Sequence, residues 1–107
     1  MRIVRTTAFE KSLKRLGAST KDIAKLEETI AADPQAGDVI KGLSGARKIR
    51  FTLGGRGKRG GGRAIYVLIV AAEAAYLLLA YSKKDQDDLS EGQTKAIAAL
   101  IKELKDG

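Results

Sequence analysis

"RKIRFTL" at residues 47–53 decides the fold, because hydrophobic residues recur here at every second position. Upstream, the hydrophobic residues follow the longer period of a helix. Successive side chains of a strand point to opposite faces, so this pattern predicts a strand with one buried face, formed by Ile49, Phe51 and Leu53. Lys48 and Arg50 are therefore expected to project side by side from its other face.

Two further runs after residue 60 predict the strands that pair with this one. Residues 63–70, "RAIYVLIV", are apolar enough for a central strand, and residues 75–82 form a second β-rich run. Ala and Glu at 71–75 are unusual in a hairpin turn. Residues 64–81 could alternatively form one membrane-spanning helix, because Glu73 is the only charged residue there. A hairpin is favoured, because a carboxylate in a bilayer is costly and β-branched residues suit strands.

The N-terminal half predicts one strand and two helices. Residues 1–5 read as an edge strand. Thr7 and Glu10 have the spacing of a capping box for a helix that ends near Gly17. Ser19 caps a second helix, which Pro34 ends near Ala32. These two helices are expected to form a hairpin, followed by a short extended piece at 38–40.

A third helix is predicted at the C-terminus, where Ser90 and Gln93 form another capping box. The fold class is therefore α+β, with a small, twisted, mainly antiparallel sheet, an N-terminal helical hairpin and a C-terminal helix. At 107 residues, the chain is expected to form a single domain, residues 1–107.

The composition excludes several kinds of chemistry. The chain has no Cys and no His, which removes disulfides, thiolate sites, thiol nucleophiles and the usual general base near neutral pH. The first residues lack the apolar core of a secretion signal, so a cytoplasmic protein is expected. No metal, no other cofactor and no membrane are expected.

The positive charge is concentrated in one third of the sequence. Between Asp38 and Glu73 there are 8 basic residues and no acidic ones, whereas the rest of the chain has 12 basic and 13 acidic residues. A charge run is often only a solvated face. Its concentration here favours a polyanionic partner: RNA, DNA or an acidic protein.

The glycine-rich segment "GGRGKRGGGR" at 54–63 contains a match to G-x-G-x-x-G. A dinucleotide site is rejected, because that motif should follow an apolar parallel strand and open a helix. A Walker loop is also rejected, because the sequence contains no Gly-Lys-Ser or Gly-Lys-Thr. A mobile hairpin loop and a fragment of RGG-type RNA-binding sequence are the other readings. Its position between two strands favours a cationic loop that binds a polyanion.

If that polyanion is RNA, the cations could also catalyse its cleavage. Attack by the 2′-hydroxyl requires proton transfer and stabilisation of extra charge on the phosphorus. Arg binds phosphate oxygens as a planar fork, and a Lys crowded by other cations can donate or accept a proton. The candidates for catalysis without a metal are Lys48, Arg50, Arg63 and Lys83.

Three stretches in order, "GDVIKGLSGARKIRF", "GRGKRGGGRAIYV" and "AYSKKDQDDLS", resemble the RelE/ParE superfamily of bacterial toxins, most closely HigB-like RelE-type members. The resemblance covers residues 37–90. It implies a ribosome-dependent endoribonuclease that cleaves mRNA without a metal, inhibits translation and is neutralised by a cognate antitoxin. It also implies that the four candidates match the basic positions of the family.

Other residues are expected to contact RNA: Arg47, Arg56, Lys58, Arg59 and Lys84. Some relatives carry a catalytic Tyr after the last strand, but residues 85–89 contain none, so proton transfer is unassigned. Tyr81 is a candidate for base stacking or for the core. Two alternatives remain: a ParE-type inhibitor of DNA gyrase on the same fold, and an RNA-binding module without catalysis.

Overall fold

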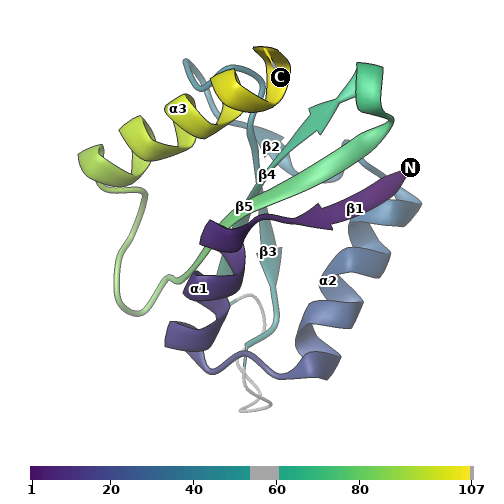
Figure 1. The fold of residues 1–107 in the computed structure, drawn as a ribbon. Coiled ribbons are helices and arrows are strands. Elements are labelled where there is room, and N and C mark those ends of the chain that lie inside the picture. The colour runs from purple at the N-terminus through teal and green to yellow at the C-terminus, as the bar shows by residue number, and fades with distance from the viewer. Residues whose placement is uncertain (54–60, 107) are drawn as a thin grey trace.

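A computed structural model describes residues 1–53 and 61–106, and this part of the chain forms an α+β fold around one sheet, as predicted (Figure 1). The elements in chain order are β1 (Arg2–Arg5), α1 (Thr7–Leu16), α2 (Thr20–Ala32), β2 (Asp38–Val39), β3 (Arg47–Phe51), β4 (Gly62–Ile69), the 3-10 turn η1 (Val70–Ala72), β5 (Ala74–Ser82) and α3 (Glu91–Asp106).

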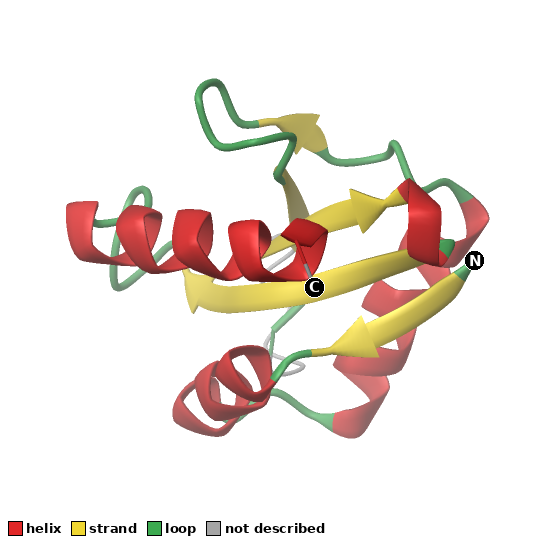
Figure 2. Ribbon diagram, turned by 45° about the horizontal axis from the view of Figure 1, so that its top comes forward, coloured by secondary structure: helices red, strands yellow, loops and turns green. Residues whose placement is uncertain are grey.

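The sheet has five strands in the described residues, in the order β1-β5-β4-β3-β2. β1 lies at one edge, as predicted, and runs parallel to β5, whereas the other three pairs are antiparallel. Figure 2 shows α1 and α2 on one face of the sheet and α3 on the other. The N-terminal helical hairpin and the C-terminal helix therefore cover opposite faces.

Each face of the sheet has its own hydrophobic core. One core joins α1 and α2 to the sheet and includes Phe9, Leu13, Leu26, Tyr66 and Leu77. The other joins α3 to the sheet and includes Ile65, Val67, Leu78, Ile97 and Ile101. Alternate residues of β4 contribute to opposite cores, as the two-residue period of a strand requires. Strand residues of the first core point toward α1 and α2, and strand residues of the second core point toward α3.

The observed helix ends match the ends predicted from the sequence, except at the start of α1. Thr6, not Thr7, is the N-cap, and its hydroxyl accepts a hydrogen bond from the Phe9 N–H at 3.1 Å. The Thr6 hydroxyl also donates to the Leu77 carbonyl, which fixes the cap against β5. Ser19 caps α2 as predicted, and Ser90 and Gln93 exchange the two hydrogen bonds of a capping box.

The β4–β5 connection explains why Ala and Glu are acceptable in this turn. Residues Val70–Ala72 form one 3-10 turn, and Glu73 takes a left-handed conformation with φ 50°. A single helical turn suits Ala, and one left-handed residue then reverses the chain. The hairpin replaces the alternative of a membrane-spanning helix at 64–81. No helix in the described part of the chain is long and apolar enough to cross a membrane.

Tyr66 ties the sheet to the segment that follows α2. Its buried hydroxyl donates to the Pro34 carbonyl at 2.8 Å and accepts from the Gly37 N–H at 2.9 Å. Burial raises the pKa of Tyr66, and the Gly37 hydrogen bond and Arg47 only partly offset this rise. The folded state therefore favours the neutral phenol. That contribution to stability is complete below the ordinary tyrosine pKa and is lost as pH rises through the higher pKa of the folded state.

Tyr66→Phe should lower the free energy of unfolding by about 1–2 kcal/mol, because the buried Gly37 N–H loses its acceptor. Urea denaturation measures the change. Tyr76→Phe is the matched control, since Tyr76 is half-buried on the α3 side of the sheet and should change stability little. Equal stability of the Tyr66 variant and the wild-type protein would contradict this role.

Candidate functional site

Arg50, Arg63 and Tyr81 form a row across three strands. Arg50 on β3 pairs with Arg63 on β4, and Arg63 pairs with Tyr81 on β5. Tyr81 packs in the core under α3, so the row lies on the α3 face of the sheet. Side chains directly opposite each other in antiparallel strands have Cβ atoms about 4.5–5.5 Å apart. The fold therefore holds two arginines next to each other.

Two guanidinium groups at directly opposite positions repel each other. Arg50 is exposed, whereas Arg63 is only 7% exposed and its Nη1 donates to the Gly62 carbonyl at 3.0 Å. A phosphate group between two such forks would relieve the repulsion and accept hydrogen bonds from both. This geometry suits an anion with several oxygen atoms.

Lys48 extends the cationic row along β3. It lies two residues before Arg50, so it is on the same face of the sheet, opposite Ile65. Its ammonium group is 3.4 Å from a carboxylate oxygen of Asp88, in the segment that connects β5 to α3. The alternation in β3 therefore predicted correctly that Lys48 shares a face with Arg50, but it did not identify Asp88 as the acidic partner.

Tyr81 is a buried member of the row. It is 4% exposed, and within the described residues its hydroxyl is a buried polar atom without a hydrogen-bond partner. Burial raises the pKa of Tyr81, Asp88 raises it further, and Arg63 opposes the rise. Tyr81 thus belongs to the core, next to its strand partner Arg63.

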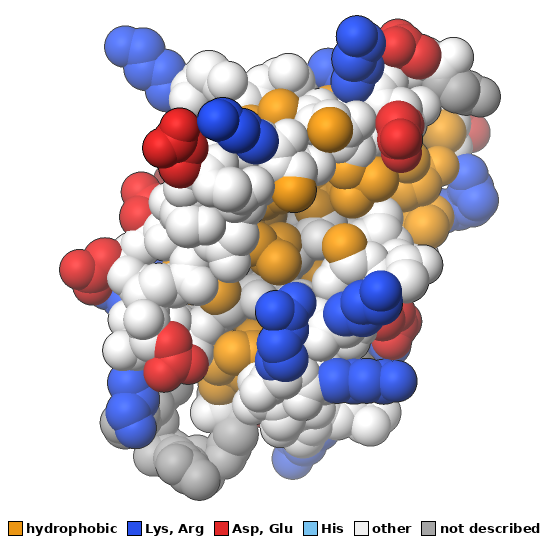
Figure 3. All heavy atoms as spheres, turned by 60° about the vertical axis from the view of Figure 1, so that its left-hand side comes forward, with side chains coloured by type: hydrophobic (Ala, Val, Ile, Leu, Met, Phe, Trp, Pro, Cys, Tyr) orange, Lys and Arg blue, Asp and Glu red, His pale blue; other side chains and the backbone are white. Residues whose placement is uncertain are grey.

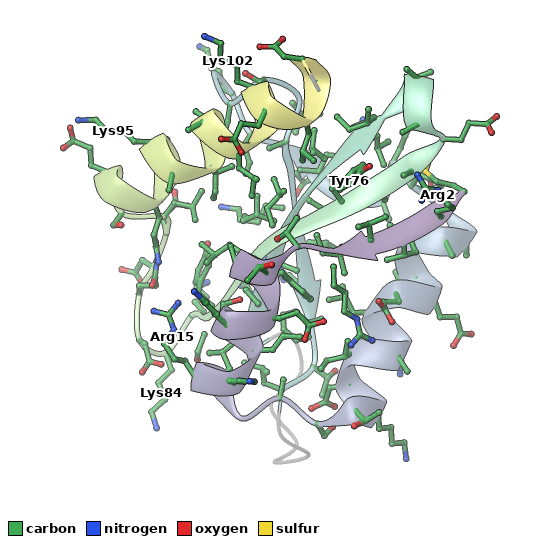
Figure 4. All side chains as sticks on the ribbon, in the orientation of Figure 1. Arg2, Arg15, Tyr76, Lys84, Lys95 and Lys102 are labelled. Atoms are coloured by element: carbon green, nitrogen blue, oxygen red, sulfur yellow. The ribbon has the colours of Figure 1, made fainter. Side chains whose placement is uncertain are left out.

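The segment between β5 and α3, residues 83–90, is called the connector here. The Lys83 N–H donates to the Gly61 carbonyl at 3.0 Å, which continues the β4–β5 hairpin by one step. This bond places the exposed Lys83 just beyond the end of β5, two residues after Tyr81. Lys84 is also exposed and points away from the sheet (Figure 4). The connector turns back through bonds of the Gln86 amide to the Asp88 carbonyl and the Gln93 side chain.

Arg47, another predicted RNA contact, is not part of the row. The Arg47 guanidinium donates to the carbonyls of Gln35 and Gly37, so it holds the segment after α2. Arg56, Lys58 and Arg59 lie outside the described residues.

A small cavity of about 180 Å³ lies between the C-terminal half of α1 and the connector. Ser12, Arg15, Tyr81 and Gln93 are among the residues that line it. Figure 3 shows this side of the molecule, where an apolar band is bordered by both basic and acidic side chains. In residues 1–53 and 61–106, no group of three or more acidic side chains could hold a metal ion.

The fold agrees with the comparison with known proteins. A family model described as the RelE toxin of the RelE/RelB toxin–antitoxin system matches residues 1–106. The chain belongs to this family. It is therefore a toxin of a toxin–antitoxin system, and membership in the RelE family implies a cognate antitoxin. The resemblance to the RelE/ParE superfamily is confirmed, while closeness to HigB-like members in particular stays a prediction.

Solved structures of RelE from E. coli have the same fold. An arginine-to-alanine double mutant in the free state is 12% identical, with a TM-score of 0.58, and the match covers 94% of this chain and 95% of that one. The isolated toxin is 16% identical, with a TM-score of 0.53, and the match covers 92% and 97% of the two chains. At these identities, the similarity concerns the fold.

Proposed function

We propose that this RelE-family toxin is a ribosome-dependent endoribonuclease that cleaves mRNA without a metal and so inhibits translation. The observation that supports the proposal is the row on the α3 face, where Arg50 and Arg63 are directly opposed and Lys48 lies beside them. A toxin that acts on translating ribosomes works in the cytoplasm, with mRNA and the ribosome as its partners.

In the proposed reaction, the 2′-hydroxyl loses its proton and its oxygen attacks the adjacent phosphorus. The bond to the 5′ oxygen breaks, and that oxygen takes up a proton. Arg50 and Arg63 bind the phosphate oxygens, whose negative charge grows in the transition state. Lys48 and Lys83 add positive charge, and these two amines are our candidates for proton transfer. Arg47 and Lys84, together with the cations of the 54–60 segment, are proposed to contact RNA outside the reacting phosphate.

The proposal predicts growth arrest when the chain is expressed in bacteria without its antitoxin. Purified protein should also stop translation in a cell-free reaction and leave mRNA fragments. DNA supercoiling by gyrase should be measured beside it with the same preparation. Loss of supercoiling with intact mRNA would instead indicate a ParE-type gyrase inhibitor. RNA binding without fragments would indicate a module without catalysis, and either result would overturn the proposal.

A further inference from the structure

Asp88 brings a negative charge to the cationic row. Its carboxylate oxygen Oδ1 lies 3.4 Å from the Lys48 Nζ and accepts a hydrogen bond from the Leu89 N–H at 2.8 Å. The hydrogen bond from the Leu89 N–H lowers the pKa of Asp88, and Lys48 lowers it further by a smaller amount. The carboxylate is therefore ionised at neutral pH. An anionic oxygen therefore already lies against Lys48, one of the cations on the face to which we assign RNA binding.

The two groups around this oxygen are those that bind phosphates. Lysine ammonium groups and backbone N–H groups are common donors to the phosphate oxygens of nucleic acids. Lys48 also lies two residues from Arg50 on the same face, about 6–7 Å along the strand. This is close to the spacing of neighbouring phosphates in a nucleic acid strand. An RNA that places one phosphate between Arg50 and Arg63 would bring a second one toward the position of the Asp88 carboxylate.

We propose that Asp88 is an internal competitor for an RNA phosphate at Lys48, and that RNA binding displaces the Asp88 side chain into solvent. The inference rests on the proposed function, because it assumes that the row binds RNA. It assigns a position to one phosphate of the substrate and gives the connector a role in limiting RNA binding when substrate is scarce.

The exposure of the ion pair is compatible with displacement. The side chain of Asp88 is 70% exposed and that of Lys48 is 33% exposed. Exposed ion pairs are weak and are screened by salt. RNA presents many phosphates at once, so it can replace this single carboxylate without unfolding the connector. The connector keeps its own hydrogen bonds from Gln86 to Gln93 and to the Asp88 carbonyl when only the Asp88 side chain rotates.

Asp88→Asn tests the inference, with Asp87→Asn as the matched control. Both changes raise the net charge by one at neighbouring exposed positions, so their long-range effects on RNA are equal. Asn keeps an oxygen that can accept from the Leu89 N–H, so the connector should stay folded. Fluorescence anisotropy at low salt measures binding of a labelled 2′-O-methyl oligoribonucleotide, which cannot be cleaved. Asp88→Asn should bind about two- to fivefold more tightly than Asp87→Asn, the range expected for loss of one exposed competing pair.

Lys48→Ala completes the test, because the two Asn changes should have equal effects once Lys48 is absent. Equal binding by Asp88→Asn and Asp87→Asn in the wild-type background would overturn the inference and leave the RNA-binding function intact. Failure of every variant and of the wild-type protein to bind the oligonucleotide would overturn the inference, whereas the proposed function is tested separately by fragmentation of mRNA in a translation reaction.

Discussion

Arg50→Ala should reduce mRNA cleavage by about 10²–10³-fold, the usual loss when one preformed donor to a transition-state oxyanion is removed. Arg50 is exposed and lies directly opposite Arg63, so its guanidinium can reach a phosphate without rearrangement of the core. Because Arg50 is exposed, its loss should leave the fold intact. Cleavage is measured as the rate at which a defined mRNA is fragmented in a cell-free translation reaction.

Two variants separate the role of Arg50 from the effect of charge alone. Lys41→Ala removes a cation from the same basic segment, but Lys41 precedes the other end of β3, so cleavage should change little. Arg50→Lys keeps the charge but loses the planar fork, and its activity should fall between those of the wild type and Arg50→Ala. Equal losses in Arg50→Ala and Lys41→Ala would show that only overall charge matters and would contradict the assignment.

Gly62→Ala should lower the free energy of unfolding by about 1–3 kcal/mol, the usual cost of forcing an extra carbon into a packed site. A Cβ atom on Gly62 would lie 2.6 Å from Phe51 Cε1 and 2.9 Å from Leu53 Cγ. Phe51 is the direct partner of Gly62 across β3 and β4 and is 6% exposed, so its ring has little room to move. The same change should disturb the neighbouring Arg50–Arg63 pair and reduce cleavage.

Gly92→Ala makes the same substitution at a position with free space, so we expect the opposite effect on stability. Gly92 lies in the first turn of α3, and a Cβ atom there would meet no other atom within 4 Å. Ala is favoured over Gly in a helix, so this variant should be more stable by about 0.5–1 kcal/mol. Urea denaturation of both variants measures the two changes. Destabilisation of similar size at both positions would contradict the account of Gly62.

The alternation of residues in β3 was sufficient to predict which face Lys48 and Arg50 share, because the period of a strand fixes side-chain direction. The same period places Arg47 on the other side, where its guanidinium binds backbone carbonyls. A sequence pattern does not give the register between strands. The opposition of Arg50 to Arg63 and of Arg63 to Tyr81 therefore came only from the structure.

Asp88 could not be predicted as a partner of Lys48, because the path of an irregular connector is set by tertiary contacts. Its position next to the capping box of α3 was the only local signal, since a short acidic side chain there can accept from a backbone N–H. The shift of the α1 cap from Thr7 to Thr6 has a similar cause. Both residues can cap a helix, and the bond from Thr6 to the Leu77 carbonyl selects one of them.

The chemical ends of the mRNA fragments test the central claim most directly. Attack by the 2′-hydroxyl at the phosphate held by Arg50 and Arg63 leaves a 2′,3′-cyclic phosphate on one fragment and a 5′-hydroxyl on the other. Mass spectrometry of fragments from a translation reaction distinguishes these ends from those of water-mediated hydrolysis. We predict cyclic phosphate and 5′-hydroxyl ends that disappear in Arg50→Ala. Fragments with 5′-phosphate and 3′-hydroxyl ends, or an mRNA that stays intact, would contradict the account.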